Sequence, residues 1–248
     1  MDTQKQVWDQ LWSKEVSYEW DSLSELIYRT LCTYIGSPEG RKIVEAGSGT
    51  GKISMHLSKH GADVTLVDYS ENAINNSRLA FQKQNCSGSF VVNDIRKMDI
   101  SDDGYDLTWN AGVVEHFTFE EKVTILKEML RVTTPGGAVI ILTPYAKCLP
   151  YRIGKDFAEK QGTWMYGHEE PVVTLEEEFK ASGIHFLEER NIGFINSLDF
   201  LDFLPGTSII KETIKTWYEG LTAEEQGHFP GYLLVSVGEK RNIEKIVE

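Results

Sequence analysis

The amino-acid sequence predicts an α/β protein whose core is a largely parallel sheet. Two observations lead to this fold class. Short β-like apolar runs alternate with helical patterns from residue 42 onwards, and a loop with three glycines follows the first run. Alternation of this kind is typical of βαβ units, in which a helix carries the chain back so that the next strand pairs in parallel.

The elements can be predicted in order along the chain. Apolar residues recur at helical spacing over residues 2–16 and 21–35, and Gly36-Ser37-Pro38 ends the second helix. Seven β-like runs follow, so the sheet is expected to have seven strands. The runs are 42–46, 63–67, 89–92, 105–109, 138–142, 184–187 and 232–237, and the helical patterns between them are 51–59, 71–83, 119–131, 175–181 and 209–219.

A glycine-rich loop is the most informative motif. Gly47, Gly49 and Gly51 stand on alternate positions directly after the first β-like run, and Asp68 closes the next run. Glycines at the end of a strand let the backbone approach a ligand where a Cβ would collide, and an acid about 20 residues further on suits a ribose diol. A dinucleotide fingerprint would have its third glycine at Lys52, so the spacing disfavours a nicotinamide cofactor.

The stretch from Glu45 to Gly51, an acid, one residue and then G-x-G-x-G, resembles motif I of the class I S-adenosylmethionine-dependent methyltransferases. Pro135-Gly136-Gly137 resembles the turn before the fifth strand in many members. The resemblance covers residues 40–142 by motif and 172–240 by order of elements. It implies a doubly wound, mostly parallel seven-stranded sheet with helices on both faces, an antiparallel last strand and an N-terminal helical lid.

We expect one domain over residues 1–248, because this length suits a single core and no low-complexity linker interrupts the chain. The resemblance implies a division within it. Residues 1–35 would form the lid, 40–142 the cofactor-binding core, 143–171 a substrate or lid insertion, and 172–248 the C-terminal part of the sheet.

The resemblance implies S-adenosylmethionine as the cofactor and S-adenosylhomocysteine as the product. Glu45 would contact the methionine amino group; alternatively, it is a strand-end acid satisfied by loop N–H groups. Asp68, followed by Tyr69, would bind the two ribose hydroxyls. Its alternative role is a helix N-cap, but Ser70 already suits that position. The loop that wraps the methionine and ribose consists of Gly47, Ser48, Gly49, Thr50 and Gly51.

Two later strand ends complete the expected cofactor site. By resemblance, Asp94 accepts from the adenine amino group and Ile95 flanks the ring, although Asp94 could also be a plain loop aspartate. Loops at the carboxyl ends of parallel strands are where open α/β sheets bind ligands. Asn110 and Ala111 belong to a stretch that resembles motif IV and would pass beside the sulfonium.

The pair Glu115-His116 follows this stretch and is the candidate for catalysis. His116 as a general base would suit an acceptor hydroxyl or amine near neutral pH. The alternative is a pair that caps or braces the next helix. Some relatives bind a divalent metal through E-x-x-E-H, but Gly112 stands where the first acid would be, so no metal is predicted.

Aromatic residues suggest where an acceptor would bind. Trp164, Tyr166, Tyr145 and His168 lie in the segment 143–171, which reads as loop-rich, and aromatic walls with a few polar groups suit small ligands. The alternative is a hydrophobic cluster under a long loop. Trp20 lies where a lid would meet the cofactor, with packing inside the lid as its alternative role. Aromatic rings together with acids could also receive a cationic amine.

Composition excludes several classes of function. The formal charge of −13, without a basic block, disfavours nucleic acid as a partner. No apolar run is long enough for a membrane span and no signal peptide is indicated, so a cytoplasmic location is the expectation. Cys32, Cys86 and Cys148 stand far apart, which argues against a disulfide framework and a zinc cluster.

The sequence therefore predicts an S-adenosylmethionine-dependent methyltransferase that transfers a methyl group to a small molecule by in-line displacement. The alternatives are a protein acceptor and a non-catalytic cofactor-binding module; a nicotinamide-dependent oxidoreductase is disfavoured by the glycine spacing. The residues do not distinguish an O, N, S or C acceptor atom. They also leave open a homodimer, and the apolar residues of 200–204 are either packing or a dimer contact.

Overall fold

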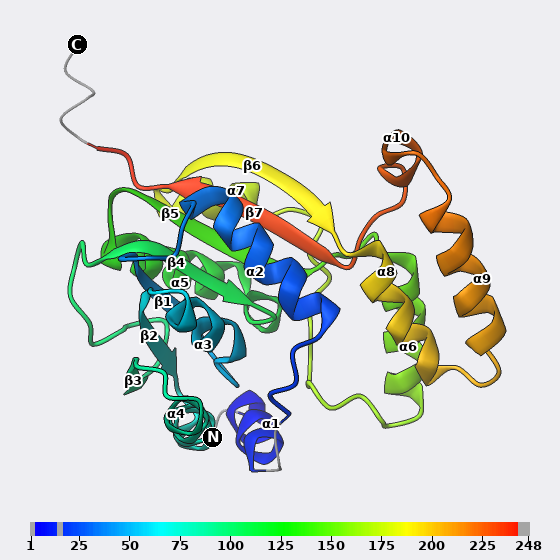
Figure 1. The fold of residues 1–248 in the computed structure, drawn as a ribbon, viewed down its shortest axis with the longest axis horizontal. Coiled ribbons are helices and arrows are strands. Elements are labelled where there is room, and N and C mark those ends of the chain that lie inside the picture. The colour runs from blue at the N-terminus through cyan, green and yellow to red at the C-terminus, as the bar shows by residue number, and fades with distance from the viewer. Residues whose placement is uncertain (1–2, 14–16, 243–248) are drawn as a thin grey trace.

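The computed structural model describes residues 3–13 and 17–242. In this part of the chain seven strands form one sheet in the order β3-β2-β1-β4-β5-β7-β6 (Figure 1). Five strands pair in parallel, and β7 runs antiparallel to both of its neighbours, which confirms the predicted sheet. The strands are β1 (Lys42–Ala46), β2 (Asp63–Asp68), β3 (Ser89–Val92), β4 (Tyr105–Ala111), β5 (Thr133–Pro144), β6 (His185–Ile192) and β7 (Leu233–Glu239).

Helices cover both faces of the sheet, with α2, α3 and α4 on one face and α5 and α7 on the other (Figure 1). The α-helices are α1 (Thr3–Trp12), α2 (Ser22–Ile35), α3 (Lys52–Lys59), α4 (Glu71–Lys83), α5 (Phe119–Val132), α6 (Leu149–Lys160), α7 (Glu176–Ser182), α8 (Phe194–Ser197), α9 (Ser208–Glu219) and α10 (Ala223–Gln226). Short 3₁₀ helices are η1 (Val114–His116) and η2 (Leu198–Phe203).

Successive residues of the central strands belong to two different hydrophobic clusters. Ile43 and Ile140 pack in the cluster under α2, α3 and α4, whereas Val44 and Ile141 pack in the cluster under α5 and α7. Side chains alternate between the faces of a strand, so a strand buried on both faces must be apolar throughout. This is why the β-like runs are continuous rather than alternating in the sequence.

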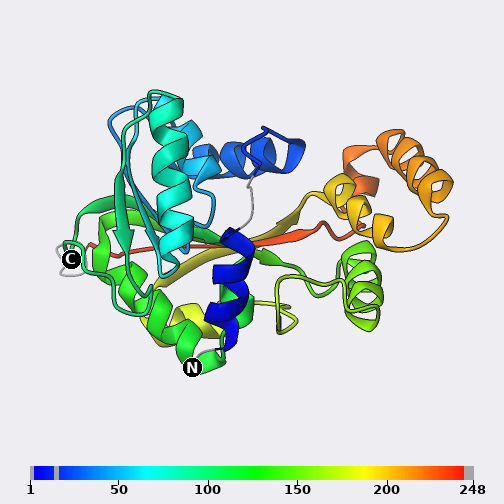
Figure 2. The ribbon, with the colours of Figure 1, turned by 90° about the horizontal axis from the view of Figure 1, so that it is seen from below.

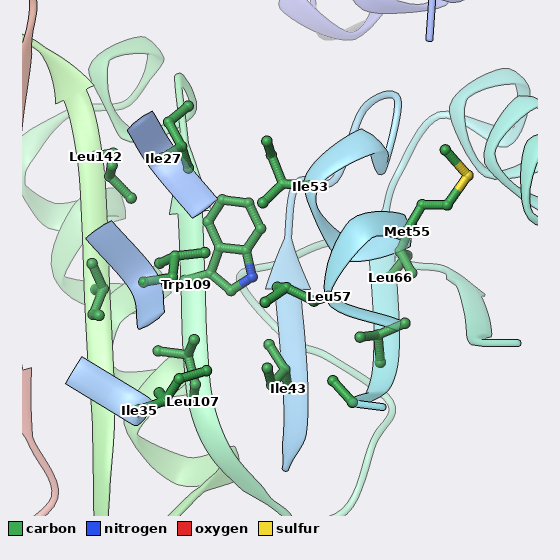
Figure 3. Close-up of a cluster of buried hydrophobic side chains, with 14 of the residues drawn as sticks. Ile27, Ile35, Ile43, Ile53, Met55, Leu57, Leu66, Leu107, Trp109 and Leu142 are labelled. Carbon is green, nitrogen blue, oxygen red and sulfur yellow. The ribbon is translucent and has the colours of Figure 1, made fainter. Parts of the chain in front are cut away.

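Trp109 is the largest fully buried side chain. It stands near the end of β4, and Figure 3 shows its ring between Ile27 of α2 and Ile53 of α3. An aromatic ring of this size fills the space between two helices and the sheet, where its burial stabilises the fold by about 2–3 kcal/mol. The strand ends that carry the candidate site are therefore held by a tightly packed core.

A group of helices lies beyond the sheet, at the end where β5 and β6 finish (Figures 1 and 2). It consists of α6, α8, η2, α9 and α10, and α6 packs on η2. The expectation of a loop-rich segment at 143–171 was wrong over α6. Pro150 in the first turn and Gly154 in the interior weaken the helical signal, but Gly154 is required because a Cβ there would lie 2.1 Å from the carbonyl oxygen of Phe200.

The N-terminal helix α1 is described over Thr3–Trp12, and the predicted residues 2 and 14–16 lie outside the described part of the chain. Figure 2 shows α1 beside α4 and apart from α2. The three cysteines are free. Among the described helices none combines the length and the apolar character that a membrane span requires.

Candidate active site

A cavity of about 730 Å³ opens at the edge of the sheet where the parallel strands end. Asp68, Ala111 and Pro144 line it, and they are the last residues of β2, β4 and β5. Open α/β sheets bind ligands at this edge, next to the strand at which the strand order reverses, because the loops on either side of that strand diverge. In this sheet the strand is β1, with β2 and β3 on one side and β4 and β5 on the other. The cavity is the natural place for a ligand.

The glycine loop between β1 and α3 forms one wall of the cavity. Gly47 has a φ of 79°, and a Cβ added to it would lie 2.9 Å from Val113. A Cβ on Gly49 would lie 2.8 Å from the ring of Trp12. Ser48, between them, is buried and its Oγ has no hydrogen-bond partner in the described residues. Because a buried hydroxyl without a partner is costly, this atom fits a site completed by a polar ligand.

Gly51 does not line the cavity, although the sequence suggested a cofactor contact. It caps α3 with a φ of 63°, and a Cβ there would lie 2.2 Å from Cδ2 of Leu66 and 3.1 Å from Oγ of Ser77. The third glycine therefore allows α3 to start close to β2 and α4. Thr50 remains at the cavity wall beside Gly49.

Glu45 and Asp68 are two buried acids that face the cavity. Glu45 Oε2 accepts a 2.6 Å hydrogen bond from Ser54, and burial raises the pKa of Glu45 to about 8, with the nearby charge of Asp68 adding to the effect. Asp68 accepts from the backbone N–H of Gly49 at 2.9 Å and from that of Ser70 at 2.8 Å. Burial raises the pKa of Asp68 to about 6, although these two hydrogen bonds oppose the shift.

Ser70 caps α4 as the sequence predicted, with its side chain accepting from the N–H of Ala73. Asp68 thus does not serve as the cap of α4. Each carboxylate oxygen can accept a second hydrogen bond, so Asp68 still has capacity for ligand hydroxyls, and Tyr69 lines the cavity next to it.

Asp94 and Ile95 reach the cavity after β3, but Asp94 is not a free acceptor. Its carboxylate pairs with the guanidinium of Arg96 at 2.7 Å and accepts from the backbone N–H of Arg96 at 2.9 Å. Partial burial acts to raise the pKa of Asp94, but the hydrogen bonds from Arg96 lower it below the usual range. A ligand amino group here would share the carboxylate with Arg96, a neighbour that the sequence reasoning missed.

Asn110 and Ala111 at the end of β4 differ in position. Ala111 lines the cavity, whereas Asn110 is fully buried behind it. The Nδ2 group of Asn110 donates to the sulfur of Met129 at 3.8 Å, and its Oδ1 has no hydrogen-bond partner in the described residues. The alternation of side chains along a strand turns Asn110 away from the face on which Ala111 lies.

Glu115 and His116 form η1 and line the cavity beyond the glycine loop. Glu115 Oε2 accepts a 2.9 Å hydrogen bond from Thr143, and Oε1 lies 3.9 Å from Nε2 of His116. Burial raises the pKa of Glu115 to about 8, and the charge of Glu169 adds to the effect. Near pH 8 the protonated and ionised forms of this carboxyl group are both present, and the ionised form is the one that can act as a general base.

His116 is bound by its other ring nitrogen. Its Nδ1 lies 2.6 Å from the carbonyl oxygen of His168, and because a carbonyl only accepts, Nδ1 carries the hydrogen. Burial lowers the pKa of His116 to about 4, although the bond to His168 opposes the shift. The imidazole is thus neutral near pH 7 and a weaker base than Glu115, and it holds the segment around His168 against η1.

The part of the cavity beyond η1 is walled by aromatic rings and a second acid, and we call it the far end. Trp164 and Tyr166 lie there as predicted from the aromatic pattern, and Glu169 joins Glu115. Burial raises the pKa of Glu169, while Tyr151 donates a hydrogen bond to its carboxylate. The far end consists of Glu115, Trp164, Tyr166, Glu169, Phe200, Phe203 and Tyr232.

Phe200, Phe203 and Tyr232 were missed as site residues because they come from η2 and from the residue before β7, far along the chain. Phe200 and Tyr232 have ring centroids 4.7 Å apart, and Trp164 lies 6.0 Å from Phe203. Their apolar pattern looks like ordinary packing in the sequence. Only the contact between α6 and η2 brings them to the cavity.

Three predicted substrate residues do not line the cavity. Trp20 stacks on His56 with centroids 4.0 Å apart and donates to Glu25 at 3.0 Å, so it packs beside α2 and α3. Tyr145 forms a bridge with Val172. His168 contributes its carbonyl oxygen to His116. Trp20 is thus held by its own neighbours, whereas Tyr145 and His168 fix the segment that follows β5.

Helix α1 forms part of the cavity lining through Gln4, Trp8 and Trp12. Trp12 contacts the glycine loop at Gly49, and Trp8 packs edge-on against His116 at 5.1 Å and near Tyr166 at 6.3 Å. Asp9 accepts a 2.8 Å hydrogen bond from Ser70 at the start of α4. The helix therefore contacts both the glycine loop and the far end.

Comparisons with known proteins agree with this architecture. Residues 43–137 match a family model described as a methyltransferase domain. The chain is 31% identical over 127 residues to malonyl-[acyl-carrier protein] O-methyltransferase of Erwinia billingiae, covering 51% of this chain and 48% of that protein. It is 33% identical over 113 residues to an S-adenosyl-L-methionine-dependent Diels-Alderase of Talaromyces variabilis, covering 43% of this chain and 37% of that protein. The chain thus matches half or less of these relatives.

Among solved structures, geranyl diphosphate C-methyltransferase from Streptomyces coelicolor A3(2), in complex with Mg²⁺, geranyl diphosphate and S-adenosyl-L-homocysteine, has a TM-score of 0.66. The two chains are 11% identical over 97% of this chain and 98% of the other. At that identity the likeness shows the fold alone, and the fold is that of the class I methyltransferases. Together with the matched methyltransferase domain, the relatives and this fold support a class I S-adenosylmethionine-dependent methyltransferase, the class whose cofactor is S-adenosylmethionine.

The residues at the cavity fit this cofactor. The glycine loop leaves space that a Cβ would fill at Gly47 and Gly49, and the orphaned Oγ of Ser48 offers a hydrogen bond to a polar ligand. Glu45 is a buried acid without an ion-pair partner in the described residues, and an amino group would supply the missing charge. No group of three or more potential metal ligands occurs in the described part of the chain.

Proposed function

We propose that the protein transfers a methyl group from S-adenosylmethionine to a small-molecule acceptor by in-line displacement. The observation that carries this proposal is that one cavity joins the glycine loop, with Glu45 and Asp68, to the far end, with Glu115 and Glu169. A methyltransferase needs both compartments in line, because the acceptor atom must approach the methyl carbon opposite the sulfur. The relatives named as methyltransferases support the same reaction class.

In this proposal Glu45 binds the methionine ammonium and Asp68 the ribose hydroxyls. Asp94 and Ile95 flank the adenine, with Arg96 fixing the Asp94 carboxylate. The glycine loop contributes backbone N–H groups and Ser48 Oγ. When bound, the cofactor supplies an activated methyl carbon, so the protein has only to orient the acceptor, exclude water and remove a proton where the acceptor carries one.

Glu115 is the proposed proton acceptor, and His116 a positioning residue. Both were candidates on sequence grounds, but burial shifts their pKa values in opposite senses, to about 8 for Glu115 and about 4 for His116. A base with a pKa near the working pH combines availability with strength. His116 fixes the backbone at His168 and hence the approach of Glu169, which follows it directly.

The remaining expectations about the whole chain are part of the proposal. Residues 1–248 would act as one domain, with 1–35 as the lid and 143–171 as part of the acceptor wall. Lining residues from α1 and from residues 164–169 support this division. A cytoplasmic location and the absence of a nucleic-acid partner rest on composition, and cell fractionation would test the former. A homodimer is also part of the proposal, and light scattering would test it; of the apolar residues in 200–204 that were its expected contact, Phe200 and Phe203 line the cavity and Leu201 is buried.

The test is a calorimetric titration of the purified protein with S-adenosylmethionine, S-adenosylhomocysteine and NADH side by side. Binding of the two sulfur compounds but not NADH would support the proposal, and binding of NADH alone would refute it. Labelled methyl groups should then appear in a metabolite fraction. Stoichiometric labelling of a protein instead would favour the protein-acceptor alternative.

A second candidate function has one observation in its favour, the relative named as an S-adenosyl-L-methionine-dependent Diels-Alderase. A chain of this kind can bind the cofactor in the service of another reaction. The discriminating readout is S-adenosylhomocysteine formed in the presence of metabolite extract. Extract-dependent formation favours methyl transfer, whereas binding without consumption favours the second candidate or the non-catalytic module.

A further inference from the structure

Apart from Asp68, which accepts two backbone hydrogen bonds, three buried acids that line the cavity have no lysine or arginine partner in the described residues. Glu45, Glu115 and Glu169 are 7%, 2% and 8% exposed. In the described residues none of them forms an ion pair with a lysine or arginine, and the histidine contact of Glu115 involves a ring that burial keeps neutral. A carboxyl group buried without a counter-charge takes up a proton in the ligand-free protein, which is why burial raises the pKa of all three acids, because the ionised form costs several kcal/mol there. A ligand that brings positive charge would offset this cost.

The cofactor accounts for only one of the three acids. In the proposed function, on which this inference rests, the methionine ammonium pairs with Glu45 beside the glycine loop. Glu115, which belongs to η1, and Glu169 lie at the far end, and the charge of Glu169 adds to the raised pKa of Glu115. Their counter-charge must therefore come from the second ligand.

The nearby lysines are engaged elsewhere. Lys122 Nζ lies 3.6 Å from the carboxylate of Glu170, and Lys155 forms its ion pair with Glu159. The Nζ of Lys155 also lies over the ring of Trp164, 5.3 Å from the ring centroid. Both lysines lower the cost of the acids from a distance, but neither lines the cavity.

The rings at the far end are a separate observation that points to the same charge. Trp164 and Tyr166 have centroids 5.2 Å apart, and the row continues through Phe200 and Phe203 to Tyr232. The negative faces of aromatic rings attract ammonium groups, most strongly where water is excluded. Carboxylates flanked by rings form a pocket for a cation with an apolar body.

We propose that the far end binds a small cationic amine and that the amine nitrogen is the methyl acceptor. Glu115 takes one proton from the ammonium, which leaves the lone pair free to form the new nitrogen–carbon bond. The carbon–sulfur bond breaks with its electron pair on sulfur, which yields S-adenosylhomocysteine. The product is a methylated ammonium, and Glu169 is the carboxylate that faces its charge. A neutral hydroxyl acceptor would leave both acids without a counter-charge.

The test compares matched amines and alcohols by calorimetry on protein saturated with S-adenosylhomocysteine. Benzylamine is paired with benzyl alcohol, and hexylamine with hexan-1-ol, because each pair differs chiefly in charge. We expect each amine to bind at least about tenfold more tightly than its alcohol. The variants Glu115→Gln and Glu169→Gln should each lose about tenfold of this preference, while Glu219→Gln, an exposed acid at the end of α9, should retain it.

The design separates failure of this inference from failure of the proposed function. If S-adenosylhomocysteine binds but the amine and alcohol of both pairs bind equally or not at all, the inference is overturned and the methyltransferase proposal stands. If S-adenosylhomocysteine does not bind to the unaltered protein, both are overturned. Retention of the amine preference in both glutamine variants, with circular dichroism unchanged, would also overturn the inference. Production of a methylated amine from labelled S-adenosylmethionine would support it independently.

Discussion

The cofactor end and the far end of the same cavity are built from different kinds of material. At the cofactor end, a single loop and the ends of adjacent strands present backbone and carboxylate groups, and Gly47 keeps one wall open. At the far end, side chains from η1, residues 164–169, η2 and the residue before β7 meet. A site built from one backbone loop therefore leaves a contiguous motif in the sequence, whereas a site built from side chains of distant segments leaves none.

The largest effect should come from a change in the backbone wall. Gly47→Ala places a Cβ 2.9 Å from Val113 at a φ of 79°, so the loop must move. We expect the affinity for S-adenosylhomocysteine, measured by calorimetry, to fall on the order of 100-fold. The matched control is Gly220→Ala at the end of α9, where the φ is −82° and no atom lies closer than 3.4 Å. Equal effects of the two substitutions would show that Gly47 has no special role at the cofactor end.

A smaller loss is expected from the ribose acid. Asp68→Asn removes the charge and one acceptor oxygen, and should weaken cofactor binding by about 10- to 100-fold, or about 1–3 kcal/mol. The melting temperature should be measured alongside as a check on folding, because Asp68 also accepts from Gly49 and Ser70 in the folded protein. Asp63→Asn, at the exposed start of the same strand, is the control. Unchanged cofactor affinity in the Asp68 variant would remove this residue from the site.

At the far end, the prediction concerns stability and pH. The pKa of Glu115 is raised from 4.5 to about 8 by burial, so its protonated form stabilises the ligand-free fold fully below pH 4.5, and this contribution is lost as the pH rises towards 8. Glu115→Gln should therefore raise the melting temperature at pH 8 by a few degrees, on the order of 1 kcal/mol, and change it little at pH 4.5.

The opposite pH dependence, with stabilisation greatest at low pH, would mean that Glu115 is ionised and paired in the folded protein. Glu169, His116, Tyr232 and Lys122 surround the same group, so the variant should be compared over the whole pH range. The pKa of Glu45 is also raised to about 8, but Glu45 is present in both the unaltered protein and the variant, so its contribution cancels when the two are compared.

The smallest effect should come from one ring of the far end. Trp164→Leu should weaken the binding of benzylamine by about three- to tenfold through loss of a cation–π contact. The affinity for S-adenosylhomocysteine, whose proposed site is the other end of the cavity, should change by about twofold or less. Substitutions at distant sites usually act independently to within about 0.5 kcal/mol. A parallel loss of both affinities would show that the two ends are not separable.

The fold was predictable because the sheet is buried on both faces, so its strands appear as continuous apolar runs separated by amphipathic helices. Most of the strand-end residues named from the glycine motif do line the cavity, although Gly51 packs against Leu66 and Asn110 faces the core. Their roles toward a cofactor remain predictions. Sequence patterns specify the chain direction and the strand ends, and these place such residues together.

The far end was only partly predictable. Trp164 and Tyr166 could be named from aromatic content, but Trp20, Tyr145 and His168 have the same content and lie elsewhere. Phe200 and Tyr232 reach the cavity through the packing of η2 on α6, which depends on Gly154, a residue that reads as a helix breaker. Long-range packing of this kind leaves no periodic trace in the sequence.

Helix α1 has a thermodynamic consequence. Trp12 rests on the glycine loop, and Trp8, one turn earlier, rests on His116 and beside Tyr166, so one rigid element spans both ligands. The ligand that binds first restricts the motion of this helix and bears most of the loss of conformational entropy. The second ligand then binds with a smaller entropic loss. The two affinities are thereby linked, and by reciprocity each ligand must tighten the other by the same factor.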